Sequence, residues 1–332
     1  MALAVVAAVA ILTTRWYANA LKPTGTEEQA IVVKDGATPK QVAAELADRK
    51  LIKSAAAFRW HVSRTGLGKD IKAGRYRLDG RTPSPEIAKA LAAGPQADAN
   101  RFTVKEGQTQ QTIANTLSKL GGFDRQEFAN LKAKDFTGYD FLKDLPDDAT
   151  LEGFLFPETY EIPPPETATK EVATVLLNQF QKELAPQLSQ LRASSRSLFD
   201  TVTVASIVEV EVRSDEDRRL VAGIIYRRLR EDIRLDADAT LRYGIDKPTE
   251  ALTKSDLDSD NPYNTRKHKG LPPGPVSNPG IASLKAATNP QASDYLFYLS
   301  AKDGTTVFAR TLEEHEANVE QYLAVAQQAA DP

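Results

Sequence analysis

The stretch Thr201–Asp215, TVTVASIVEVEVRSD, sets two carboxylates, Glu209 and Glu211, into a run of apolar residues. A charged side chain avoids an apolar interior unless it is paired or has a chemical role. Burial raises the pKa of a glutamate because it disfavours the ionised form, and such a group can hold and donate a proton near neutral pH. We therefore interpret this stretch as the carrier of a general acid.

The secondary structure of this stretch decides how the two glutamates can work. Its alternating valines favour a β-strand, whereas the segment Ala205-Ser206-Ile207 breaks the alternation. On a strand, Glu209 and Glu211 share one face and could act as a pair of catalytic carboxylates. On a helix they lie about 200° apart, so one can face a cleft while the other packs elsewhere. The residue pattern alone leaves both arrangements open.

Composition restricts the classes of protein to consider. The chain has 332 residues, 41% apolar and 26% charged, which is typical of a globular protein with two or three domains. The net charge of −3 argues against a nucleic-acid partner, since nucleic-acid affinity comes mostly from phosphate neutralisation. The absence of cysteine excludes disulfides, thiolate metal sites and a cysteine nucleophile. The histidines His61, His268 and His315 are widely separated, which argues against a zinc enzyme, and no motif calls for another metal or an organic cofactor.

The N-terminus carries an uncharged apolar run, Ala2–Leu12. The run is too short to span a bilayer, which takes about 20 apolar residues. It also lacks the basic residues that open a signal peptide. We expect the sequence to begin inside a membrane anchor that covers residues 1–20, with Trp16 and Tyr17 at its outer interface.

Two segments repeat a strand–turn–helix pattern. They are IVVKDGATPKQVAAEL at residues 31–46 and FTVKEGQTQQTIANTL at residues 102–117. The arrangement resembles LysM, a carbohydrate-binding module for the N-acetylglucosamine backbone of peptidoglycan, although two generic βα units fit the pattern equally well. We predict a LysM-like glycan-binding region at residues 28–120 and a connector at residues 121–150.

The motifs after residue 150 resemble one family. In order and spacing they are similar to the endolytic peptidoglycan (murein) transglycosylases of the MltG, or YceG-like, type. The likeness covers residues 151 to the C-terminus at motif level, and residues 31–117 more loosely. The motifs are LEGFLFPETY at 151–160, ASIVEVE at 205–211, RLDADATLRYG at 234–244, PYNT at 262–265 and GLPPGPVSNPGIASLKAA at 270–287.

This resemblance implies an α+β fold. It would consist of the N-terminal membrane anchor, the small LysM-like βα region and a mixed α+β catalytic domain at residues 151–330. The enzyme would be anchored once in the cytoplasmic (inner) membrane with its catalytic domain on the outer side. It would cut the β-1,4 bond between N-acetylmuramic acid and N-acetylglucosamine inside nascent glycan strands, leave a 1,6-anhydro end and stop elongation. The resemblance also suggests coupling to peptidoglycan synthases.

The family carries its catalytic glutamate in a helix of the form xSIxExE, which maps onto Glu211 and favours the helix over the strand. The chain departs from the family pattern at Val210 and at residues 226–229, where an Asn-Arg-Leu run is usual. Some substrate-binding candidates rest on family position and others on side chains that suit a sugar. They are Glu209, Glu152, Thr240, Tyr243, Tyr263, Asn264 and Pro273.

A lytic transglycosylase can work with one carboxyl group. The acid protonates the leaving oxygen, an oxocarbenium-like centre forms, and the resulting carboxylate takes the proton from the sugar's own C6 hydroxyl. Proximity of that hydroxyl supplies much of the rate. Two alternatives remain open: a muramidase, that is a hydrolase using Glu209 and Glu211 together, and a non-catalytic scaffold that binds peptidoglycan through the LysM-like repeats.

Overall fold

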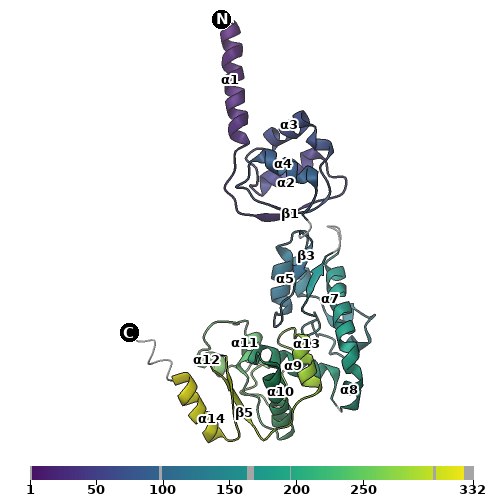
Figure 1. The fold of residues 1–332 in the computed structure, drawn as a ribbon, viewed down its shortest axis with the longest axis vertical. Helices are drawn as coiled ribbons and strands as arrows, with labels where there is room; N and C mark the ends of the chain where they lie inside the picture. Colours follow the sequence, from purple (N-terminus) through teal and green to yellow (C-terminus); the bar gives the residue numbers. More distant parts are fainter. Residues whose placement is uncertain (1, 97–98, 163–167, 195, 302–303, 325–332) are drawn as a thin grey trace. The chain divides into compact units, whose positions relative to one another are not determined.

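The computed structural model describes residues 2–96, 99–162, 168–194, 196–301 and 304–324. The chain divides into two units, which we describe separately (Figure 1). Unit 1 contains residues 1–102, 114–125 and 159–172, and unit 2 contains residues 103–113, 126–158 and 173–332. The chain combines helices with three separate pairs of short strands among the described residues, which confirms the α+β class.

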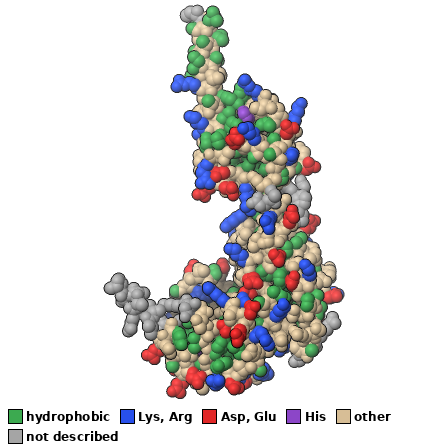
Figure 2. Space-filling model, viewed as in Figure 1, with side chains coloured by type: hydrophobic (Ala, Val, Ile, Leu, Met, Phe, Trp, Pro, Cys, Tyr) green, Lys and Arg blue, Asp and Glu red, His purple; other side chains and the backbone are tan. Residues whose placement is uncertain are grey.

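The chain begins with one long apolar helix, α1 (Ala2–Ala20). The apolar run at residues 2–12, which alone is too short to span a bilayer, continues as helix through residues 13–20. The 19-residue helix is long and apolar enough to cross a membrane, with a length of about 28 Å against a hydrocarbon core of about 30 Å. Hydrophobic side chains are exposed along it (Figure 2). The helix therefore suggests a membrane anchor.

Unit 1 is built on an antiparallel pair of strands, in which Ile31 lies opposite Tyr76. Helices α2, α3 and α4 pack with this pair around one apolar core, which includes Leu46, Phe58 and Leu91. Thr38 caps α2 in a capping box with Gln41. The elements are β1 (Gln29–Val33), α2 (Pro39–Asp48), α3 (Ala55–Thr65), η1 (Leu67–Lys69), β2 (Gly74–Leu78) and α4 (Ser84–Ala93).

The second predicted strand–turn–helix segment is also confirmed. Its strand pairs with β4, and its turn contains Gly107 at a φ of 76°, a left-handed conformation that glycine adopts without strain. Short helices follow before the next strand. The elements are β3 (Arg101–Thr103), α5 (Gln110–Ser118), α6 (Arg125–Ala129), η2 (Ala133–Asp135), η3 (Asp140–Leu142) and β4 (Thr159–Glu161).

Unit 2 is centred on three helices, α9, α10 and α13, which pack against one another. Upstream of them, Pro186 lies in the short turn η4 that separates α7 from α8. The elements are α7 (Thr169–Leu184), η4 (Ala185–Gln187), α8 (Leu188–Ala193), α9 (Leu198–Glu211), α10 (Asp215–Arg230), α11 (Asp238–Gly244), α12 (Lys254–Leu257), α13 (Ile281–Thr288), β5 (Phe297–Ser300), β6 (Thr306–Ala309), α14 (Leu312–Val319) and the π-helical turn η5 (Glu320–Ala324).

Helix α9 contains residues 201–211, with both Glu209 and Glu211, so the prediction of a helix is confirmed and the strand arrangement is wrong. The hydroxyl of Ser197 caps its start by accepting from the Asp200 N–H at 3.0 Å. Residues 201–208 are buried on all sides, because α10, α11 and α13 cover the helix. This burial overrides the strand preference of the valines. The helix ends at Glu211, since Val212 is extended.

Gly223 allows α10 to approach the segment after α13 closely. The Arg219 carbonyl accepts a hydrogen bond from the Gln291 N–H at 2.9 Å. A Cβ at residue 223 would lie 1.9 Å from the Gln291 carbonyl oxygen, so one of the two backbones must move.

We expect Gly223→Ala to lower the free energy of unfolding by about 1–3 kcal/mol, despite alanine's better helix propensity. Urea denaturation measures the change. Gly138→Ala is the matched control, because a Cβ there meets no atom within 4 Å. Equal stability of the two variants would contradict the close approach.

Candidate active site

Glu211 lies at the exposed end of α9, and its side chain is half-buried. The backbone N–H of Ala239, in the first turn of α11, donates a hydrogen bond to its carboxylate. Burial, together with the negative charge of Asp238, raises the pKa of Glu211 to about 7, although the Ala239 N–H, Arg266 and Arg242 lower it. The carboxyl group can therefore be protonated or ionised near neutral pH.

An ion pair between Asp238 and Arg266 lies beside Glu211. The Nη2 and Nε atoms of Arg266 contact Oδ1 of Asp238 at 2.6 and 2.7 Å. Arg242, one turn further along α11, donates to the carbonyl oxygens of Lys247 and Glu250. The charges around Glu211 are thus held in fixed positions by their own partners.

Strand β5 forms a further boundary of this site. Burial and the charge of Glu211 raise the pKa of the Tyr298 hydroxyl well above its usual value, so the hydroxyl stays protonated. The Ser300 hydroxyl donates to the Glu211 carbonyl oxygen at 2.8 Å and connects the end of α9 to β5.

Glu209 has different surroundings from Glu211. Its side chain is only 5% exposed and is paired with Arg218, with an Nη2 to Oε1 distance of 3.4 Å. Its other oxygen accepts from the Gly280 N–H at 2.9 Å. Arg218 also contacts Asp215 at 2.7 Å. Glu209 therefore joins α9 to α10 and to the start of α13.

Glu106 lies against the same backbone turn. Its Oε1 is so close to Gly280 that an added Cβ would lie 1.8 Å away, so glycine is required at that position while Glu106 stays in place. Burial and the charge of Glu209 raise the pKa of Glu106. Two carboxylates thus approach the N-terminus of α13, where negative charge is favourable.

Glu152 lies at the centre of a buried hydrogen-bond network. Its carboxylate accepts from the Gln110 N–H at 2.9 Å, from Asn278 Nδ2 at 2.7 Å and from the Tyr243 hydroxyl. Burial raises the pKa of Glu152 to about 8, although these hydrogen bonds lower it. Asn278 also bonds the Leu155 N–H at 2.9 Å. The network joins the LEGFLFP segment to the GLPPGPVSNPG loop.

The predicted substrate-binding residues differ in their surroundings. The structure brings Glu152, Tyr243 and Tyr263 together, with the two tyrosine rings 5.0 Å apart, and burial raises the pKa of Tyr263 to about 12. Thr240 and Asn264 are fully buried and bonded internally. Pro273 is exposed on its loop, and Glu209 is held as described above.

Asn264 shows how a buried motif residue serves the site. Its Nδ2 donates to the Leu257 and Ser259 carbonyl oxygens at 3.0 and 2.8 Å. Its Oδ1 accepts from the Arg266 N–H at 3.2 Å, in an Asx-type turn. This turn precedes the Arg266 side chain that contacts Asp238.

Sequence reasoning missed several residues around Glu211 and Glu209. Asp238 and Arg242 lie in the quoted RLDADATLRYG motif at helical i, i+4 spacing, and Arg266 follows PYNT directly, so a search for charges within the motifs could have found them. Glu106 and Tyr298 come from distant segments, and no local pattern connects them to α9.

The comparisons with known proteins agree with this architecture. A profile of the YceG-like family matches residues 31–321. An endolytic murein transglycosylase of Bacillus subtilis (strain 168) is 30% identical over 306 residues, which cover 89% of this chain and 84% of that protein. An endolytic murein transglycosylase of Streptococcus pneumoniae serotype 2 is 27% identical over 319 residues, which cover 88% of this chain and 58% of that longer protein.

A solved structure extends the likeness to the fold. It is that of a yceG-like protein from Listeria monocytogenes, with a TM-score of 0.63 and 30% sequence identity. The match covers 88% of this chain and 99% of that one. With the profile matching most of the chain, this protein belongs to the YceG-like family.

Proposed function

We propose that the chain is an endolytic murein transglycosylase in which Glu211 alone acts as acid and base. The observation that carries this proposal is the separation of the two glutamates on α9. Glu209 is engaged with Arg218 and Gly280, whereas Glu211 is half-buried beside Asp238 with a pKa raised to about 7 by burial. A hydrolase that uses both carboxylates needs them on opposite sides of one bond. The named relatives support the same activity.

In this mechanism protonated Glu211 gives its proton to the glycosidic oxygen. The bond from that oxygen to C1 of N-acetylmuramic acid breaks, and positive charge develops at C1. The Glu211 carboxylate then takes the proton of the C6 hydroxyl, whose oxygen bonds to C1 and closes the 1,6-anhydro ring. Arg242, Arg266 and the Ala239 N–H favour the ionised form, while burial and Asp238 favour the protonated one, so both halves of the cycle are accessible.

The remaining motif residues would shape the cleft. Tyr243 and Tyr263 present adjacent rings of the kind that pack against sugars, and Pro273 would form part of an exposed wall. The loops that carry these residues would be held in place by buried hydrogen bonds of Glu152, Thr240 and Asn264. Glu209 and Glu106 would fix the start of α13.

Glu209→Gln tests the single-acid proposal against the two-carboxylate hydrolase. The amide oxygen can still accept from the Gly280 N–H, but the ion pair with Arg218 is lost, so we expect a loss of stability of about 1–3 kcal/mol. Cleavage should persist with the anhydro product unchanged. Chromatography of the products measures the extent of cleavage and identifies the anhydro ends. A loss of cleavage as complete as that of Glu211→Gln, in a folded protein, would favour the hydrolase.

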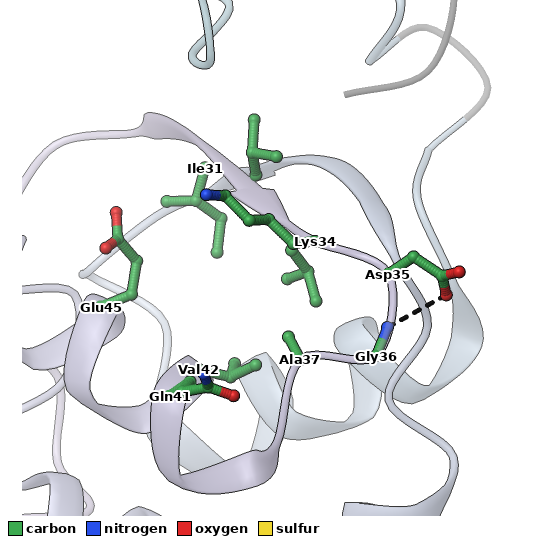
Figure 3. Close-up of a pocket in the computed structure, with 10 residues that line it drawn as sticks. Ile31, Lys34, Asp35, Gly36, Ala37, Gln41, Val42 and Glu45 are labelled. Carbon is green, nitrogen blue, oxygen red and sulfur yellow. Dashed lines mark hydrogen bonds between the residues drawn. The ribbon is translucent and has the colours of Figure 1, made fainter. Parts of the chain in front are cut away.

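We further propose that unit 1 binds glycan as a LysM-like module. The order β1–α2–α3–β2 with antiparallel strands supports the likeness. A cavity of about 250 Å³ lies between β1, the turn after it and α2. Ile31 and Val42 supply apolar surface there, and Lys34, Gln41 and Glu45 supply polar groups (Figure 3). This mixture of apolar and polar groups suits an N-acetyl sugar.

Filling this cavity should weaken glycan binding. We expect Ala37→Phe to reduce the affinity of the detergent-solubilised full chain for N-acetylglucosamine oligomers by about tenfold or more, or 1.4 kcal/mol. Calorimetric titration measures the affinity. Ala56→Phe is the control, because residue 56 is exposed on α3 and does not line the cavity. Unchanged binding by the Ala37 variant would exclude this cavity as the glycan site.

The location of the enzyme follows from its substrate and from α1. Murein lies outside the cytoplasmic membrane, so the proposed orientation places α1 in that membrane and the rest of the chain on the outer side. There the chain would meet nascent glycan strands beside the peptidoglycan synthases that make them.

A further inference from the structure

Helix α3 of unit 1 packs beside the last turn of α1. The ring of Tyr17, near the end of α1, meets the ring of Trp60 on α3 edge-on, with centroids 4.3 Å apart. The Tyr17 hydroxyl also forms a hydrogen bond with Nδ1 of His61 at 3.0 Å. Figure 1 shows α3 at the end of unit 1 from which α1 extends, and β1 at the other end. Trp60 is therefore held at the level where the apolar helix ends.

This level corresponds to a membrane interface if α1 spans the bilayer. Tryptophan and tyrosine gather at the headgroup region, where the ring is apolar and its polar group remains wet. Trp16 is 56% exposed and Trp60 48% exposed, which is unusual for the only two tryptophans of a chain. Packing inside the protein therefore does not account for the position of either ring.

The exposed face of α3 has the chemistry of a lipid-binding surface. Phe58 and Val62 face the core, whereas Arg59, Trp60, Ser63 and Arg64 are exposed at i, i+1, i+4 and i+5. The Arg64 guanidinium lies 5.1 Å from the centroid of the Trp60 ring. The face thus combines one large amphipathic ring with two cations.

The sequence around α3 adds to this positive charge. The chain has a net charge of −3, yet the segment from residue 53 to residue 69 contains basic residues and no acidic one. They are Lys53, Arg59, Arg64 and Lys69. Each basic residue near an anionic membrane contributes about 1 kcal/mol of binding free energy.

We propose that the exposed face of α3, formed by Arg59, Trp60, Ser63 and Arg64, docks on the anionic phospholipid headgroups around α1. This inference rests on the proposed anchoring role of α1. It adds a second membrane contact, which holds unit 1 at the membrane surface instead of leaving unit 1 free to turn on its anchor. Because Trp60 contacts Tyr17, inserting α1 brings α3 to the headgroups.

The two tryptophans allow the anchor and the docking face to be tested separately. The full chain is reconstituted into phosphatidylcholine–phosphatidylglycerol vesicles that contain brominated lipid, which quenches tryptophan on contact. In the Trp16→Phe variant only Trp60 reports, and in Trp60→Phe only Trp16 reports. We expect quenching in both. Quenched Trp16 with unquenched Trp60 would overturn the docking and leave the anchor intact, whereas unquenched Trp16 would overturn the anchor as well.

The charge requirement is tested in the Trp16→Phe background. We expect Arg59→Gln with Arg64→Gln to reduce the docked fraction, with the docking equilibrium falling about fivefold for each arginine. The control, Lys34→Gln with Lys40→Gln, removes the same charge from the β1–α2 segment and should leave Trp60 quenching unchanged. Equal effects of the two pairs, or no dependence on phosphatidylglycerol, would overturn the role of the α3 face.

Discussion

The variant Glu211→Gln is expected to lower the rate of glycan cleavage by about 10²–10⁴-fold, the contribution typical of a positioned acid or base. The amide keeps the shape of the side chain and can still accept from the Ala239 N–H, but it can neither donate the proton nor take one back. Release of anhydro-ended fragments from uncrosslinked glycan strands measures the rate. The melting temperature should change little, because Glu211 is half-buried at the end of α9.

Glu216→Gln is the matched control for this substitution. Glu216 is exposed in the first turn of α10, so its loss should leave the rate of cleavage unchanged. A folded Glu211→Gln protein that cleaves at the wild-type rate would remove Glu211 from the mechanism.

The second large effect is on pH dependence. The reaction begins with protonated Glu211, whose pKa burial and Asp238 raise to about 7. Above that pH, kcat/KM should fall about tenfold per pH unit, because the proton donor is lost. Asp238→Asn removes a negative charge that favours the protonated form, and it frees Arg266 to favour the ionised one. The pKa of Glu211 should therefore fall, and the alkaline limb should move to lower pH.

The pH profile distinguishes this effect from a general loss of activity. Asp238→Asn should lower kcat/KM more at pH 8 than at pH 6, whereas a purely structural defect would lower both alike. Asp232→Asn is the control, because Asp232 is exposed, pairs with Lys269 and is at a positive φ that asparagine tolerates. An alkaline limb at the same pH in wild type and Asp238→Asn would contradict the proposed coupling.

Local signals in the sequence were sufficient for much of the fold. The strand–turn–helix pattern at residues 31–46 and at residues 102–117 correctly predicted β1 with α2 and β3 with α5. The secondary structure of residues 201–211 was ambiguous by propensity, since the valines there suit a strand. Only the family likeness favoured a helix, and the structure shows that burial on all sides is what stabilises it.

The candidate site was harder to predict, for a physical reason. A motif shows which residue types recur together, but not which of them reach the surface. Thr240 and Asn264 are buried and hold loops, although their hydroxyl and amide groups suit a sugar. Glu106 and Tyr298 reach the two glutamates only through tertiary packing between distant segments, which no periodicity records.

The chemistry of the product ends tests the central claim most directly. Uncrosslinked glycan strands are incubated with the wild-type chain or with Glu211→Gln, and the masses of the fragments are measured by mass spectrometry. The single-acid mechanism predicts 1,6-anhydro-N-acetylmuramic acid ends from the wild type and their loss in the variant. Ordinary reducing ends from the wild type, or undiminished anhydro ends from the variant, would contradict it.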